Sequence, residues 1–196
     1  TEMDEGIVSF SPDGMTMYLT MARRSPVANT TVEIYTSKRS EQSWSKPVKY
    51  EVTPDTLSAV GHPAVSPDGN WLYFTSDMPG GYGGKDIWRI SLTSAKGSLE
   101  NLGPQINTPG DEMFPYMRAD TLLYFASDGH PGFGGLDLFR ANLDATGQRW
   151  TVENMGMPIN SSGDDFGITF GKGEEGFFSS NRGDARGYDH IYSFVL

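Results

Sequence analysis

The sequence predicts an all-β protein made of four copies of one repeat, and three observations lead to that prediction. Short segments recur at intervals of about 52 residues. Each copy contains aromatic and β-branched runs bounded by turn residues, a pattern typical of strands. No segment of a dozen residues shows helical periodicity. Four short strands per copy, with the aromatic positions in register, are typical of a β-propeller blade, so we expect four blades of four-stranded antiparallel sheet.

Each copy is expected to begin with a hairpin. The tetrapeptide Ser-Pro-Asp-Gly occurs at 11–14 and again at 66–69, and each of its residues stands at the position of a type I turn that it prefers. An aromatic strand follows, and its leading residues in the four copies are Tyr18, Tyr73, Tyr124 and Phe177. A glycine-rich loop and a third strand come next, as in 83–89 and 134–140.

The rest of the repeat sets the expected boundaries. Asp86 and Asp137 follow the glycine-rich loops, and we expect them to accept backbone hydrogen bonds that fix the next strand. A weaker fourth strand is expected at 48–52, 99–102 and 150–154. The predicted blades are 1–57, 58–109, 110–162 and 163–196, and the last lacks its outer strand. We therefore expect a piece of a larger ring, or a ring that a partner strand completes, because an unpaired edge would otherwise be exposed.

Composition limits the chemistry and the partners. The chain has 15 Lys and Arg against 25 Asp and Glu, so its net charge is −10, which disfavours nucleic acid and anionic membrane surfaces as partners. The absence of cysteine excludes disulfides, thiol catalysis and cysteine-ligated zinc. No apolar run approaches the length of a membrane span, so we expect no direct membrane insertion of this segment.

Three copies resemble a known repeat family. The segments 61–69, 73–84, 110–116, 164–170 and 179–182 look like the PD40 repeat, a WD40-like, TolB-type propeller repeat. They are similar to propellers inside OmpA-family cell-envelope proteins of Bacteroidota-type bacteria, some of which are PorE-like components of the type IX secretion apparatus. The resemblance implies a periplasmic location at the outer membrane, envelope proteins as partners, and peptidoglycan binding only through another domain of the parent. The first copy departs from the pattern at 21–26.

Acidic residues precede three of the innermost strands, at positions that surround the channel mouth of a propeller. They are Asp4, Glu5, Asp111, Glu112, Asp164 and Asp165. Carboxylates placed there could bind calcium, act as a pair in the hydrolysis of a glycan or a peptide, or cap the turns at the strand starts. We favour capping, and we expect no cofactor, with calcium as the alternative.

Residues that break the repeat are the candidates for partner binding. They are Arg23, Arg24, His62, Tyr116, Arg118, Arg182 and Arg186. Arginine and aromatic side chains are enriched at protein interfaces. The arginines at 23–24 and 182–186 occupy the same loop of the first and last copies, where they would form a basic surface for an acidic protein segment. The alternative is that they balance nearby acidic residues.

The favoured function is a non-catalytic protein-binding or scaffold module of a larger cell-envelope protein. The main alternative is a hydrolase that acts on a glycan or a peptide at the acidic channel mouth. A third interpretation is a spacer that only separates other domains. Because one fold supports many functions, the choice among them depends on the site.

Overall fold

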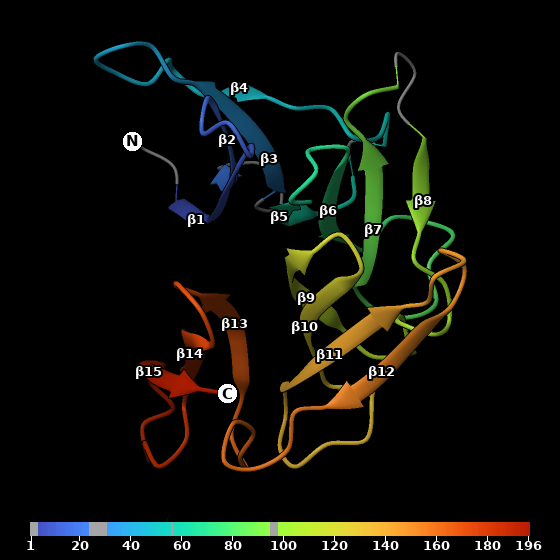
Figure 1. The fold of residues 1–196 in the computed structure, drawn as a ribbon, viewed down its shortest axis with the longest axis vertical. Helices are drawn as coiled ribbons and strands as arrows, with labels where there is room; N and C mark the ends of the chain where they lie inside the picture. The colour runs from blue at the N-terminus through green and yellow to red at the C-terminus, as the bar shows by residue number, and fades with distance from the viewer. Residues whose placement is uncertain (1–3, 24–30, 56, 95–97) are drawn as a thin grey trace.

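Four antiparallel sheets are arranged around a common centre in the computed structural model of the chain (Figure 1). The structure describes residues 4–23, 31–55, 57–94 and 98–196, without the side chains of Arg23 and Thr31. Over these residues the chain forms 15 strands and no helix, and hence no helix that could span a membrane. The first three sheets have four strands and the last has three, which confirms the predicted four-bladed β-propeller with an incomplete last blade.

Within each sheet the strands follow the order of the chain. The first sheet consists of β1 (Asp4–Phe10), β2 (Thr16–Arg23), β3 (Thr31–Lys38) and β4 (Val48–Lys49). The second consists of β5 (Val60–Val65), β6 (Trp71–Ser76), β7 (Asp86–Ser91) and β8 (Leu99–Asn101). The third consists of β9 (Glu112–Ala119), β10 (Leu122–Ser127), β11 (Asp137–Leu143) and β12 (Trp150–Asn154). The fourth consists of β13 (Asp165–Phe170), β14 (Glu175–Ser180) and β15 (His190–Val195).

The predicted turns and loop contacts form as expected. Gly14 and Gly69 each donate a backbone hydrogen bond of 2.8 Å to the carbonyl of the serine three residues earlier, which closes the first hairpin. Asp86 Oδ2 accepts from the backbone N of Tyr82 at 2.6 Å, and Asp137 Oδ2 accepts from the backbone N of Phe133 at 2.8 Å. The glycine-rich loops are therefore fixed by the first residue of the strand that follows them.

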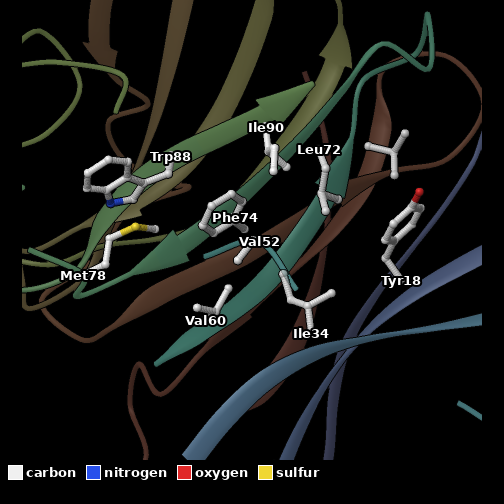
Figure 2. Close-up of a cluster of buried hydrophobic side chains, with 10 residues drawn as sticks. Tyr18, Ile34, Val52, Val60, Leu72, Phe74, Met78, Trp88 and Ile90 are labelled. Atoms are coloured by element: carbon white, nitrogen blue, oxygen red, sulfur yellow. The ribbon is translucent and has the colours of Figure 1, made fainter. Parts of the chain in front are cut away.

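Apolar clusters fill the junctions between neighbouring sheets. Figure 2 shows the cluster in which Tyr18 and Ile34 of the first sheet meet Leu72, Phe74 and Trp88 of the second. A second cluster joins the second and third sheets, and a third cluster joins the third and fourth. Their apolar side chains are largely removed from water, so these clusters supply the main force that holds the sheets together.

Backbone hydrogen bonds also tie each glycine-rich loop to the next sheet, in an arrangement that we call a junction latch. In the latch between the second and third sheets, the backbone N of Lys85 donates to Asp111 Oδ1 at 2.8 Å, and the backbone N of Glu112 donates to the carbonyl of Lys85 at 2.6 Å. In the next latch, Leu136 donates to Asp164 Oδ1 at 2.9 Å, and Asp165 donates to the carbonyl of Leu136 at 2.6 Å. The repeat therefore reproduces the junction as well as the strands.

Candidate binding site in the central channel

The innermost strands of the four sheets line a central cavity of about 510 Å³, which is open on one side because, among the described residues, the strands of the first and fourth sheets do not contact each other (Figure 1). Each of them contributes part of its wall: Ile7, Val8, Ser9 and Phe10 of β1, Pro63 and Ala64 of β5, Phe114, Pro115 and Tyr116 of β9, and Gly167, Ile168 and Thr169 of β13. Most of these side chains are apolar or aromatic. The wall is therefore suited to an apolar or aromatic group, with hydroxyls available to orient it.

All four innermost strands carry a β-bulge at the same place. The pairing register shifts at 5–8 in β1, 61–64 in β5, 113–116 in β9 and 166–169 in β13. In β5, β9 and β13 the first residue inside the bulge has a positive φ: 51° at His62, 56° at Phe114 and 64° at Gly167. Glycine adopts this backbone freely, whereas a bulky side chain is strained there by about 1–3 kcal/mol. Because such strain is concentrated at functional sites, His62 and Phe114 mark the cavity as a candidate site.

The two strained residues belong to an aromatic stack that crosses three sheets, formed by His62, Phe114 and Phe166. The His62 and Phe114 rings lie 4.1 Å apart at an interplanar angle of 14°, and the Phe114 and Phe166 rings are 4.8 Å apart. Phe114 N donates to His62 Nδ1 at 3.3 Å, and His62 N donates to Thr20 Oγ1 at 2.9 Å. The rings are thus held in place before any ligand arrives.

His62 is uncharged in this environment at neutral pH. Burial lowers the pKa of His62 to about 4, and the positive charge of Lys85 acts in the same direction. The hydrogen bond from Phe114 N requires a lone pair on Nδ1, which places the proton of the neutral ring on Nε2. Protonation of Nδ1 would therefore break this hydrogen bond between the second and third sheets.

Of the predicted partner-binding residues, Tyr116 lies in the wall of this cavity and His62 lies behind it, in contact with Phe114. Tyr116 lines the cavity directly, and its ring lies 5.8 Å from that of Phe170. His62 reaches the cavity through its stack on Phe114. The prediction that these two residues bind a partner remains untested, but the structure places both at one site.

Arg118 holds the third sheet to the fourth. Its guanidinium pairs with Glu174 at 2.9 Å, donates to the carbonyl of Gly173 at 2.8 Å, and lies 4.0 Å from the centre of the Phe170 ring. Burial would lower the pKa of Arg118, but its bonds to Glu174 and Tyr124 raise it. The side chain has a structural function at the junction.

Arg182 is held inside the fourth sheet. It pairs with Asp165 at 2.6 Å, donates to the carbonyls of Pro158 and Ile159, and stands over the rings of Phe178 and Tyr192. Its charge is therefore used to join the start of β13 to the loop after β14.

The other three arginines leave the predicted basic surface untested. Arg186 is exposed and pairs with Asp184 at 3.0 Å; this bond, followed by the one from His190, holds the pKa of Asp184 well below its usual range. Arg24 and the side chain of Arg23 lie outside the described residues. The predicted surface of four arginines therefore stays a prediction.

Four of the six predicted acidic residues form hydrogen bonds or ion pairs at the starts of β9 and β13. Asp111 and Asp164 belong to the junction latches; burial would raise the pKa of Asp111, but its bonds to Lys85 lower it. Glu112 is fully buried and accepts from Thr108 and Ser127.

Asp165 is also fully buried and accepts from Ser161 and Arg182. Asp4 and Glu5 lie exposed at the start of β1. Among the described residues, no three acidic or histidine side chains are placed to hold a metal ion. The four carboxylates at the starts of β9 and β13 therefore cap turns or bond neighbouring sheets together.

Sequence reasoning did not find Phe114, Phe166 or the bulges. One signal was present: Pro63 and Pro115 occupy equivalent positions inside two innermost strands. Proline cannot donate to a strand ladder, and inside a sheet it often marks a bulge. The residue before each proline, His62 or Phe114, is the strained one.

The comparisons with known proteins concern the fold. No protein-family model matches the sequence, and no curated protein matches it. Among solved structures, a prolyl endopeptidase is similar with a TM-score of 0.59 and 13% identity, over 99% of this chain and 25% of that protein. TolB from Acinetobacter baumannii is similar with a TM-score of 0.56 and 18% identity, over 99% of this chain and 44% of TolB.

A GH43 endo-arabinanase from Bacillus licheniformis is similar with a TM-score of 0.53 and 14% identity, over 96% of this chain and 71% of that enzyme. The chain spans a quarter of the prolyl endopeptidase and less than half of TolB. At these identities the similarity establishes the fold alone. The chain is therefore a β-propeller whose structural relatives include TolB and the propellers of hydrolases.

Proposed function

We propose that this chain is a non-catalytic protein-binding module of a larger cell-envelope protein, and that its central cavity holds a segment of the partner. The observation that carries the proposal is the cavity of about 510 Å³, whose wall is mostly apolar and includes the strained residue Phe114. The PD40-like motifs are the basis for proposing an OmpA-family-like parent in the periplasm at the outer membrane, with a secretion apparatus as one assembly to which it could belong. The structural similarity to TolB supports the propeller fold of the module.

Binding would rest on burial of an apolar side chain in a preformed site. Transfer of apolar surface from water contributes roughly 25 cal/mol per Å². The stack of His62 on Phe114 fixes both rings in advance, so little side-chain entropy is lost when the partner enters. Tyr116 and Thr169 add hydroxyls to the wall, which can select the orientation of the bound segment.

The alternative is a hydrolase, which would need a pair of accessible carboxylates at the channel mouth. In favour of binding, Glu112 and Asp165 are fully buried and hydrogen-bonded, and Asp111 pairs with Lys85 at 2.9 Å. Carboxylates with such partners are poorly placed to activate a water molecule or to protonate a leaving group.

Site-specific photo-crosslinking tests the proposal. A benzophenone side chain would replace Tyr116 in the cavity or, as the control, Phe133 in an exposed loop. With a Bacteroidota envelope extract, we expect a discrete protein crosslinked from position 116 and not from 133, and direct binding of the purified partner to be lost in Tyr116→Ala. Equal crosslinking from both positions would overturn the cavity as the site. Turnover of a glycan or peptide that Asp111→Asn abolishes would overturn the non-catalytic assignment.

A further inference from the structure

The outer edge of the fourth sheet differs from the equivalent edges of the second and third sheets. Strand β15 pairs with β14 so that Ile191 faces Ser179. In the same register, Ile87 of β7 faces Thr75, and Leu138 of β11 faces Ala126. Ile191 is therefore the structural equivalent of Ile87 and Leu138, and all three should face similar surroundings in a complete blade.

In the second and third sheets this position is covered by an asparagine clamp. Asn107 Oδ1 accepts from Ile87 N at 2.8 Å, and its Nδ2 donates to the Ile87 carbonyl at 3.0 Å. Asn160 does the same to Leu138, at 2.7 and 2.8 Å. Both asparagines are buried, and Ile87 and Leu138 are 0% exposed. Each clamp thus forms hydrogen bonds with both the backbone N–H and the carbonyl of one residue, on the outer edge of the third strand of its sheet.

The two clamps share a sequence. Asn101 and Asn154 end the outer strands β8 and β12 and accept from the clamp asparagine at 2.8 and 2.9 Å. The segments 101–107 (Asn-Leu-Gly-Pro-Gln-Ile-Asn) and 154–160 (Asn-Met-Gly-Met-Pro-Ile-Asn) have the common form Asn-x-Gly-x-x-Ile-Asn. An outer strand followed by this heptapeptide therefore completes the second and third blades, whereas the first blade has an outer strand without it.

At the fourth sheet, no described residue occupies that place. The outer edge of β15 pairs with no strand among the residues that the structure places. Ile191 is 78% exposed and Val195 is 79% exposed. A hollow of about 470 Å³ adjoins the edge, lined in part by Ile159, Tyr192 and Phe194. A strand edge of this kind presents backbone donors and acceptors to a further strand.

We propose that the edge of β15 binds the outer strand and asparagine clamp of a further copy of this repeat. The incoming strand would pair with β15 in antiparallel orientation, as β12 pairs with β11. The last asparagine of Asn-x-Gly-x-x-Ile-Asn would then bond the backbone N and carbonyl of Ile191. Edge pairing between two copies of β15 would supply a strand but no clamp, so it satisfies fewer of these groups.

A peptide that copies residues 150–162 tests the proposal on the full chain. We expect it to bind at least tenfold more tightly than the same peptide carrying Asn154→Ala and Asn160→Ala, and to shift the amide resonances of β15. Equal affinity of the two peptides would overturn the proposal. Resonance shifts confined to β11 would also overturn it, because they would mean that the peptide displaces the chain's own β12.

A variant of the protein provides the matched control. Ile191→Pro removes the outward backbone N–H at the centre of the proposed site, and proline is tolerated on an edge strand. We expect this variant to keep its melting temperature within a few degrees and to lose peptide binding. Undiminished peptide binding by this variant would overturn the proposal. A concentration-dependent dimer of the unmodified chain that Ile191→Pro abolishes would also overturn it, because the edge of β15 would then bind a second copy of the chain. This surface is separate from the central cavity, so its failure leaves the proposed function standing.

Discussion

The junctions between sheets and the wall of the central cavity are built by the same repeat, but they use it differently. At the junctions both backbone and side-chain chemistry recur: Asp111 and Asp164 make equivalent bonds, as do Asn107 and Asn160. At the cavity the backbone bulge recurs, but its strained position carries His, Phe or Gly. The shared side chains therefore hold the propeller together, whereas the variable ones shape its cavity.

The largest effect is expected where a junction leaves no room for a side chain. A Cβ at Gly134 would collide with the backbone carbonyls of Gly163 and Ser161 at the start of the next sheet. Gly134→Ala should therefore lower the free energy of unfolding by about 4 kcal/mol, measured by denaturant titration. Gly173→Ala is the control, because its Cβ meets nothing within 4 Å and only the positive φ is penalised. Equal losses in the two variants would contradict the close approach at the junction.

The second largest loss of stability is expected at the asparagine clamp. Asn160→Ala leaves the backbone N of Leu138 buried without its partner and removes one of the two hydrogen bonds to the Leu138 carbonyl, which keeps the bond from Met155 N; the change should cost about 3 kcal/mol of unfolding free energy. Asn142→Ala, on the exposed part of the same strand, should cost less than about 0.5 kcal/mol. Chemical denaturation of both variants measures the difference. A loss below 1 kcal/mol for Asn160→Ala would show that the clamp does not stabilise the junction.

The cavity predicts a loss of stability at higher pH than the junctions do, because the lowered pKa of Asp111 acts only below its ordinary value of 3.8. The pKa of His62 is lowered to about 4 from an ordinary value of 6.5, so protons bind the unfolded state more readily. The contribution of neutral His62 to the free energy of unfolding is complete above pH 6.5 and is lost as the pH falls toward 4. Between pH 7.5 and 5 we expect this residue to account for about 2 kcal/mol of lost stability. His62→Asn, which tolerates the positive φ, should flatten the profile by that amount, and an unchanged profile would refute the assignment.

The smallest expected effect isolates backbone strain at the cavity wall. Phe114→Gly and Phe114→Ala lose the same ring, but only alanine remains strained at a φ of 56°. Phe114→Gly should therefore be more stable than Phe114→Ala by about 1 kcal/mol. The same pair at Tyr116, whose φ is not positive, should show the reverse order. If alanine is favoured at both positions in thermal unfolding, Phe114 is not strained.

Local patterns made the fold predictable, whereas contacts between distant repeats decided the site. The Ser-Pro-Asp-Gly turns and the loop contacts of Asp86 and Asp137 involve neighbours in the sequence, and they form as expected. The aromatic stack joins His62 to Phe114 across about one repeat length. No local pattern specifies which rings meet at the centre of four sheets.

The arginines show the same limit of sequence reasoning. Arg118 and Arg182 break the repeat, which made them candidates for partner binding. Their guanidinium groups pair with Glu174 and Asp165 within the propeller, and their binding to a partner stays a prediction. Whether an arginine faces a partner protein or an internal carboxylate depends on how the sheets pack, and a single sequence does not reveal that packing.

The junction latches also bear on how such a chain can change its length during evolution. Each latch joins a donor and an acceptor of one repeat to an acceptor and a donor of the next, as in Lys85 with Asp111 and Glu112. Duplication of a whole repeat in the gene would supply both sides of a new latch together, so each latch would still have its partner groups. Loss of part of a repeat would leave a buried group unsatisfied, at a cost of about 1–3 kcal/mol. The latches thus favour gain or loss of entire blades over partial ones.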